Sequence, residues 1–255
     1  MFFARGYPPA QKIMSEVFVC SDAQVAAESA AQFFFALGLE MIKQNGRYNV
    51  ALAGGASPRR FHEQLAAFLL PPGWRWDCVH IFFSDERSVA PASLESNYHS
   101  AYKSFIAKIK IPPANVHRLQ GEHPDLDQAA QDYEKTLRAH FTLSKHEIPC
   151  LDLVCLGLGI DGHTASLFPG SAALAEKQRW VVKNYAQKTR SWRLTFTLPL
   201  IKRSKNVLFL VTGKEKSEVL DLVLNAKDSS LPATQVALAS RKLVWFVDKA
   251  SLGAG

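Results

Sequence analysis

The segment LDLVCLGLGIDGHTASLFPG, residues 151–170, decides the fold that this sequence predicts. It begins with an apolar run typical of a buried strand, and a turn rich in glycine follows at Gly157 and Gly159. The turn carries Asp161-Gly162-His163, and the segment ends at Phe168-Pro169-Gly170. Open α/β sheets carry their chemistry on polar side chains just beyond the carboxyl ends of buried strands. We therefore expect a mostly parallel sheet with a functional site around this triplet.

Strand-like runs alternate with helical patterns along the rest of the chain. Further strands are predicted at 16–20, 49–53, 79–83, 180–185, 192–197, 207–212 and 243–247. Helical spacing of apolar residues predicts helices over about 22–45, after Pro58, from Ser96, over 126–141 and over 216–224. This alternation is typical of βαβ units. We predict one α/β domain over residues 1–255, with a modified doubly wound, mostly parallel sheet covered by helices on both faces. Residues 180–197 are expected to add a small antiparallel pair, and residues 1–14 to form a frayed lead-in.

Composition and charge exclude several classes of function. The chain is 47% hydrophobic and 21% charged, and no apolar run approaches the ~18 residues that a membrane span needs. The net charge of +7 is scattered, without a basic block or stacking aromatic motif, which argues against nucleic acid and leaves small anions. Four cysteines without metal-ligand spacing predict buried thiols in a reducing compartment; they are Cys20, Cys78, Cys150 and Cys155. With no signal peptide pattern at the start, we expect a cytoplasmic protein.

Glycines follow the predicted strand at 49–53. Gly54 and Gly55 lie just before a helix in which Pro58 suits the first turn. Backbone N–H groups at such a helix start favour a phosphate or another anion, and Ser57 adds a hydroxyl. The spacing fits neither a Walker loop nor a dinucleotide fingerprint. A phosphate loop and a plain tight turn are therefore both open.

Charged residues follow or interrupt three other predicted strands. Asp85 and Arg87 come directly after the strand at 79–83, either as a solvated loop or as a clamp for an anion or an oxyanion. Arg193 lies in an otherwise apolar strand, where a buried guanidinium needs an anionic partner. Lys216 starts a helix, where a cation opposes the helix dipole. A shared phosphate would explain both cations; an edge-strand arginine and a solvated lysine are the alternatives.

His163 is the candidate general base. An imidazole near neutral pH can take a proton from water and later return it. Asp161 is expected to orient the ring or stabilise its charge, although two positions apart in a loop does not establish contact. No second His, Cys or carboxylate stands at ligand spacing from this triplet, so the sequence predicts no metal there.

Four motifs in order resemble the 6-phosphogluconolactonases, which share a modified doubly wound fold with the glucosamine-6-phosphate deaminases. The motifs are LAGGASP at 52–58, FSDERSV at 83–89 with SNY at 96–98, GLGIDGHTASLFPG at 157–170, and RLTFTLP with VTGKEKS within 193–217. The resemblance covers roughly residues 15–250. It implies hydrolysis of 6-phospho-D-glucono-1,5-lactone to 6-phosphogluconate, the second step of the oxidative pentose phosphate route. It implies no organic cofactor and no metal.

The resemblance also assigns residues. It implies His163 as the general base, Asp85 and Arg87 as the family's DER pair, and Arg193 and Lys216 on the phosphate side. The Gly-rich loop departs from the family pattern SGGSTP, because Ala53 and Ala56 replace two hydroxyl residues. Only Ser57 is left to contact phosphate by side chain, so we expect weaker phosphate recognition.

Two rival functions are open at this stage. Amino-sugar-phosphate deaminases carry a glutamate shortly after DGH, whereas Ser166-Leu167-Phe168 here include no carboxylate. A non-catalytic sugar-phosphate sensor would carry a DNA-binding segment, and the chain has no spare ~50 residues for a helix-turn-helix. We expect a small phosphosugar lactone as partner, no nucleic acid or membrane, and a monomer or weak homo-oligomer.

Overall fold

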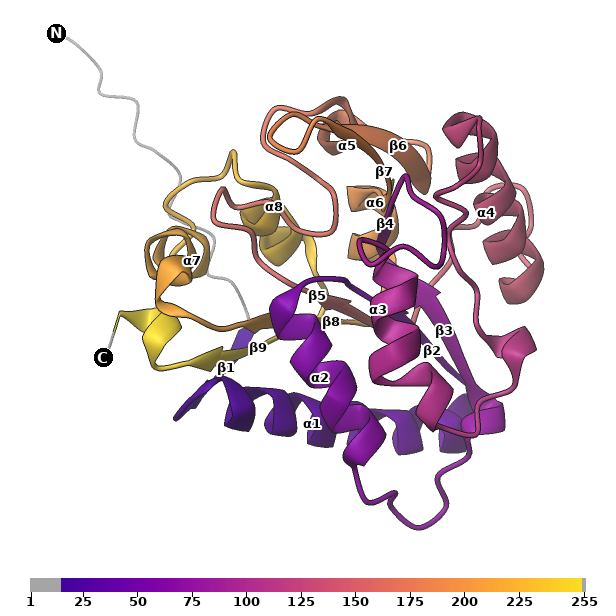
Figure 1. Ribbon diagram of the computed structural model, residues 1–255, viewed down its shortest axis with the longest axis horizontal. Coiled ribbons are helices and arrows are strands. Elements are labelled where there is room, and N and C mark those ends of the chain that lie inside the picture. The colour runs from indigo at the N-terminus through magenta and orange to yellow at the C-terminus, as the bar shows by residue number, and fades with distance from the viewer. Residues whose placement is uncertain (1–14, 254–255) are drawn as a thin grey trace, which may run out of the picture.

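A six-stranded parallel sheet forms the centre of the computed structural model, which describes residues 15–253 (Figure 1). The strand order is β1-β9-β8-β5-β2-β3, and every neighbouring pair is parallel. The strands are β1 Ser15–Cys20, β2 Tyr48–Leu52, β3 Val79–Phe83, β5 Leu153–Leu156, β8 Asn206–Val211 and β9 Leu243–Asp248. The predicted mostly parallel sheet is confirmed. The predicted lead-in at 1–14 lies outside the described residues.

A second, antiparallel sheet has the order β4-β7-β6. Its strands are β4 Asp85–Arg87, β6 Val181–Ala186 and β7 Ser191–Phe196. The antiparallel pair expected near 180–197 is confirmed. The interpretation of 85–87 as a loop is wrong, because Asp85, Glu86 and Arg87 pair with Thr195, Leu194 and Arg193. A three-residue strand of charged residues has no local sequence signal, and its partner lies about a hundred residues further on.

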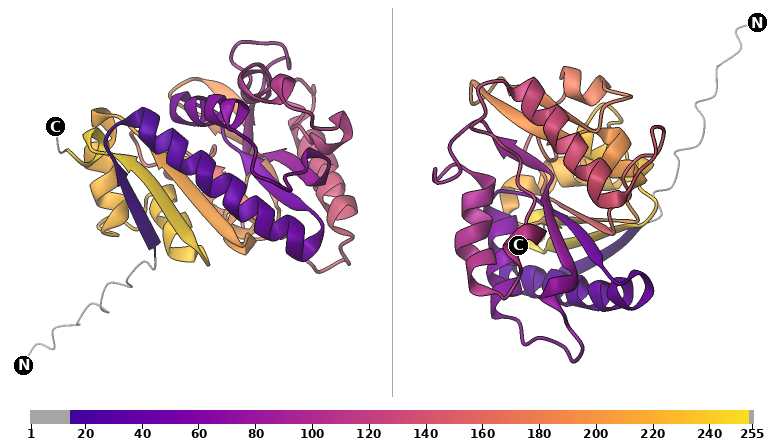
Figure 2. Two further views of the ribbon diagram at one scale, coloured as in Figure 1. Left: turned by 90° about the horizontal axis from the view of Figure 1, so that it is seen from below. Right: turned by 90° about the vertical axis from the view of Figure 1, so that its right-hand side faces the viewer.

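Helices cover both faces of the parallel sheet, as a doubly wound fold requires (Figures 1 and 2). One face carries α1 Ala23–Asn45, α2 Ala56–Ala67 and α3 Asn97–Ser104. The opposite face carries α6 Leu198–Arg203, α7 Ser217–Leu224 and α8 Pro232–Ala239. Helix α4, Leu126–Phe141, and the short α5, Ala172–Ala175, lie beside the antiparallel sheet. Single 3₁₀ turns complete the list: η1 Trp76–Cys78, η2 Ile106–Lys108, η3 Pro113–Asn115, η4 Lys214–Lys216 and η5 Ala250–Leu252.

Helix α1 shows how local signals and packing combine. The Asp22 carboxylate accepts the N–H groups of Gln24 and Val25, and Gly46 ends the helix with a positive φ of 71°. By length and composition this helix could cross a membrane, which corrects the statement that no segment approaches such a span. Its apolar side is buried in the fold, where Phe34 and Phe35 are at most 1% exposed. The apolar character of α1 is therefore accounted for by packing against the sheet.

The strand order places a crevice at one point of the sheet. From β2 the chain moves outward to β3 and then returns to form β5 on the other side of β2. The loops after β2 and β5 therefore leave the carboxyl edge in opposite directions. Ligands of open α/β sheets bind in the crevice at such a switch point.

Candidate active site

A cleft of about 1240 Å³ opens at the carboxyl edge of the parallel sheet. Its walls come from the loops after β2, β5 and β8, from β4, and from the β6–β7 hairpin. The structure brings every predicted site residue to this cleft: Gly54, Gly55, Ser57, Asp85, Arg87, Asp161, His163, Arg193 and Lys216. Segments spread over more than 160 positions of the chain thus form one site.

His163 and Asp161 are in direct contact. Nδ1 of His163 lies 2.5 Å from Oδ1 of Asp161, and the His163 backbone N–H donates to the same oxygen at 3.3 Å. The bond from His163, assisted by Lys188 Nζ at 3.1 Å from Oδ2, holds the pKa of Asp161 well below its ordinary value. An ionised carboxylate only accepts hydrogen bonds, so Nδ1 carries the proton. In the neutral imidazole Nε2 is then left with a lone pair, as a general base requires.

Steric contacts explain why glycines occupy two positions of the turn that carries His163. A Cβ at Gly159 would lie 2.0 Å from Nδ1 of His163, so any side chain there would displace the ring. Gly162 has φ +77°, and a Cβ there would lie 2.7 Å from the Leu231 side chain. Phe168 packs against the imidazole with 4.9 Å between ring centroids. The Gly-rich turn therefore sets the position of the histidine.

The start of α2 forms another wall of the cleft. Gly55 occupies the N-cap with φ 114°, and within residues 15–253 no side chain caps the first turn of this helix. Uncapped N–H groups with the helix dipole behind them attract anions. Ser57 Oγ lies 2.7 Å from Thr212 Oγ1 at the end of β8, so the two hydroxyls form a pair beside these amides. A Cβ at Gly54 would lie 1.8 Å from Oδ1 of Asn97, so only glycine allows this close approach.

Arg87 and Arg193 are direct partners across β4 and β7. Residues opposite each other in an antiparallel pair point to the same face. Burial lowers the pKa of Arg193, and the neighbouring Arg87 guanidinium lowers it further. Arg87 donates to the Glu95 carbonyl at 2.6 Å, and Arg193 donates to Thr189 Oγ1 at 3.1 Å. Two adjacent guanidiniums on a cleft wall are suited to an anionic ligand.

Asp85 and Glu86 are buried, so the interpretation of residues 85–87 as a solvated loop is wrong for these two residues. Asp85 is 7% exposed, and its Oδ2 accepts the Ser166 hydroxyl at 2.7 Å. Glu86 is 3% exposed and accepts the backbone N–H groups of Asn97 and Tyr98 at 2.7 and 2.8 Å. Burial raises the pKa of Glu86. Asp85 thus joins β4 to the segment after His163, and Glu86 holds the start of α3.

Lys216 closes the 3₁₀ turn η4 and occupies the N-cap position of α7, as part of the cleft lining. The prediction that it starts a helix is confirmed to within one residue. Several other polar residues that were not predicted also line the cleft, among them Arg60, Asn97, Lys188 and Thr212. Asn97 lies at the start of the helix predicted from Ser96, and Thr212 is the last residue of the strand predicted at 207–212, so their positions could have indicated them. Lys188 and Arg60 carry no such signal, because they sit in a polar turn and on a helix surface.

Comparison with known protein families gives a match over most of the chain. The family model described as glucosamine-6-phosphate isomerases/6-phosphogluconolactonase matches residues 21–245. The chain belongs to this family. The resemblance that the four motifs carry in the sequence is thereby confirmed.

Other members of the glucosamine-6-phosphate isomerase/6-phosphogluconolactonase family match over most of their length. A 6-phosphogluconolactonase of Synechocystis is 37% identical over 210 residues, which are 82% of this chain and 85% of the relative. The 6-phosphogluconolactonase of Rattus norvegicus is 34% identical over 239 residues, 91% of each chain. The solved 6-phosphogluconolactonase of Trypanosoma brucei superposes with a TM-score of 0.85 at 26% identity, covering 95% of this chain and 99% of that one.

Proposed function

We propose that this chain hydrolyses 6-phospho-D-glucono-1,5-lactone to 6-phospho-D-gluconate, the second step of the oxidative pentose phosphate pathway. Its relatives in Synechocystis and rat carry the name 6-phosphogluconolactonase and match more than four fifths of the chain. The observation that carries the proposal is the Asp161–His163 pair in a cleft whose other walls hold cations and uncapped amides. A base beside an anion site suits a substrate that is both an ester and a phosphate.

His163 is the proposed base for water. Nε2 takes a proton from water, and the hydroxide attacks the C1 carbonyl of the lactone. The tetrahedral oxyanion collapses, the bond from C1 to the ring oxygen breaks, and protonated His163 returns its proton to that oxygen. Asp161 keeps the ring in the required tautomer throughout. A well-placed general base contributes about 10²–10⁴-fold.

The phosphate is proposed to bind at the start of α2, where the amides of 54–57, the Ser57 hydroxyl and Lys216 meet the cleft. Arg193 is assigned to the phosphate and Arg87 to the oxyanion. Because these arginines are cross-strand partners, the two roles fall on neighbouring parts of the bound ligand. For Asp85 we propose a positioning role, since its Oδ2 is engaged by Ser166. No step needs a metal or an organic cofactor.

A coupled assay with freshly generated 6-phosphogluconolactone tests this function, with the spontaneous opening of the lactone subtracted. His163→Ala should lose about 10²–10⁴-fold in kcat, and Arg193→Ala should mainly raise KM. The exposed His146→Ala and Arg241→Ala serve as matched controls that should behave as wild type. Wild-type turnover in His163→Ala would remove this residue from the mechanism. A wild-type protein without lactonase activity would overturn the function itself.

The deaminase alternative has a separate test. Residues 164–170, TASLFPG, place no glutamate after the DGH triplet, which favours ester hydrolysis over ring-opening proton transfers. Incubation with glucosamine 6-phosphate should therefore release no ammonia. A sugar-phosphate sensor would instead show a thermal shift with ligand and no turnover.

We also propose that the protein works in the cytoplasm, as a monomer or weak homo-oligomer, without nucleic acid or membrane as partner. All four cysteines lie within residues 15–253 and are free thiols there, which suits a reducing compartment.

A further inference from the structure

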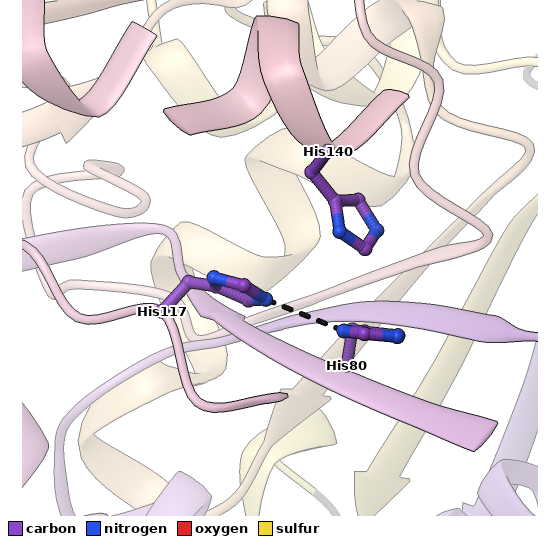
Figure 3. Close-up of side chains that lie close together, drawn as sticks. All are labelled: His80, His117 and His140. Carbon is purple, nitrogen blue, oxygen red and sulfur yellow. Dashed lines mark hydrogen bonds between the residues drawn. The ribbon is translucent and has the colours of Figure 1, made fainter. Parts of the chain in front are cut away.

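We propose that His80, His117 and His140 form a binding site for a divalent transition-metal ion, with Zn²⁺ as the probe, away from the active-site cleft. Figure 3 shows the three imidazoles converging from three segments. One ring nitrogen of each lies within 4.8 Å of the others, and His80 Nδ1 is 3.3 Å from His117 Nε2. His80 lies on β3, His117 follows η3, and His140 lies in the last turn of α4.

The spacing of the ring nitrogens is close to that of a tetrahedral site. With metal–nitrogen bonds of about 2.0–2.1 Å, two ligand nitrogens of a tetrahedral zinc are about 3.3 Å apart. The His80–His117 pair already has this separation. The other nitrogen–nitrogen distances, all within 4.8 Å, would have to shorten toward this value when an ion binds. The three rings are part-buried, so an ion can reach them and water can supply a fourth ligand.

An outer shell already orients one of the ligands. Nε2 of His140 lies 2.7 Å from Oδ1 of Asn49, whose amide nitrogen donates to Asp152 Oδ2 at 3.1 Å. The Asp152 contact sets the direction of the Asn49 amide, so Oδ1 accepts and His140 Nε2 carries the proton. Nδ1 of His140 is then the nitrogen with a lone pair. Histidines that bind metals commonly donate their other ring N–H to a carbonyl or carboxylate in this manner.

The surroundings of the three histidines include features that favour a bound cation and one that opposes it. Burial lowers the pKa of His117 to about 4 and that of His140 to about 3, and it also lowers the pKa of His80. Neutral imidazoles offer lone pairs without first losing a proton. Arg47 opposes a cation, but its guanidinium donates to the His140 carbonyl at 3.2 Å and lies over the Phe141 ring. Packing of neutral rings alone, as in the stack of His117 on Phe82 at 4.5 Å, is the competing explanation.

A metal here would act on structure rather than on the reaction. Among the described residues that line the cleft, none belongs to this trio. The three segments are the edge strand β3, the segment that pairs with Ile81 through Val116, and helix α4. Helix α4 packs on β6 of the active-site hairpin. An ion bound at the end of α4 would therefore link this helix to β3 of the parallel sheet.

The test is metal binding by the full chain, measured by equilibrium dialysis with Zn²⁺ and by absorption spectra with Co²⁺. We expect one ion per chain at this site, with the visible bands of tetrahedral Co²⁺. His117→Ala and His140→Ala should each weaken Zn²⁺ binding at least about tenfold, and the exposed His146→Ala should not. Each variant is also combined with His163→Ala, so that Zn²⁺ bound by the active-site histidine does not add to the measured binding.

Two results would overturn the site. One is that the His163→Ala protein binds Zn²⁺ no more tightly than the same protein without His117 and His140. The other is a Co²⁺ spectrum of the wild-type protein without tetrahedral bands, which decides the matter even if the alanine variants fold poorly. Thermal shift gives an independent readout, because Zn²⁺ should raise the melting temperature of wild type and of His146→Ala but not that of His117→Ala.

Discussion

At the scale of single residues, the site depends on where one imidazole is held. His163 is fixed by Asp161 on one side and by Phe168 on another, and Gly159 leaves the space that the ring occupies. The side chain is about one third exposed, toward the cleft. The position of the base is thus set by its immediate neighbours in the same turn.

Gly159→Ala should lower kcat by about 10²-fold or more, because the new Cβ would lie 2.0 Å from Nδ1 of His163 and would push the ring away from Asp161. Gly157→Ala is the matched control, since its Cβ would meet only Pro58 at 3.7 Å, an ordinary contact. Steady-state kinetics on both variants, with circular dichroism for the fold, is the measurement. Equal activities would mean that ring position does not limit the reaction.

Asp161→Asn should lower kcat by about 10²–10⁴-fold, because an amide can favour the wrong tautomer of His163. The folded pKa of Asp161 is depressed, so its carboxylate is ionised at any pH above its ordinary value of about 4. Its contribution to stability is present above that value and lost as pH falls below it. The wild-type rate profile should therefore show no loss from Asp161 between about pH 5 and 8. A wild-type kcat in Asp161→Asn would contradict the assignment.

At the scale of elements, helix α4 supports the hairpin that carries Arg193. Glu134 of α4 accepts the backbone N–H groups of Trp180 and Val181 at 2.6 and 2.9 Å, and the Arg179 side chain at 3.0 Å. Lys183 of β6 reaches back to Asp127 of α4 at 2.5 Å. The hairpin is therefore held by side chains of a helix that does not touch the cleft.

Glu134→Ala should cost about 1–3 kcal/mol of unfolding free energy, because two backbone N–H groups at the start of β6 lose their acceptor. KM should rise more than kcat falls, since the displaced hairpin carries Arg193. The exposed Glu40→Ala on α1, which bonds only Gln44, is the control. Urea unfolding and steady-state kinetics give the two readouts. A loss of stability with unchanged KM would show that α4 does not affect substrate binding.

Element boundaries were predictable where a segment carries its own pattern. Helix α4 at 126–141 and strand β3 at 79–83 match the prediction at both ends, because the apolar pattern of each lies within the segment. Strand β4 and the short helices α5, α6 and α8 were not predicted. Strand β4 and the helices α5 and α6 are too short to show a period, and β4 forms only because β7 provides hydrogen-bond partners.

At the scale of the whole molecule, burial keeps several histidines neutral. His62 is 1% exposed between Phe61 and Phe105, and within residues 15–253 neither ring nitrogen has a hydrogen-bond partner. Burial lowers its pKa to about 4. The unfolded chain has an ordinary histidine there and takes up a proton at higher pH than the fold does. Stability from this group is therefore complete above about pH 6.5 and lost as pH falls toward 4.

His62→Leu should flatten this acid limb. The loss attributable to His62 is at most on the order of 3 kcal/mol between neutral pH and pH 4. Urea unfolding of wild type and variant at several pH values between these limits measures it. The exposed His146→Leu should keep the wild-type slope. An unchanged slope in His62→Leu would show that other groups control acid unfolding.

The sequence by itself determined the fold class, the family and the membership of the site. All nine predicted site residues line one cleft. Eight of them follow strands of the parallel sheet, whose carboxyl ends meet at one edge, and Arg193 comes to the same cleft from β7 of the antiparallel sheet. Only the tertiary structure decided which of them touch. The Arg87–Arg193 pair, the Lys188 contact to Asp161 and the trio of His80, His117 and His140 join segments distant in the chain. Such contacts depend on strand register and helix packing, which no local pattern encodes.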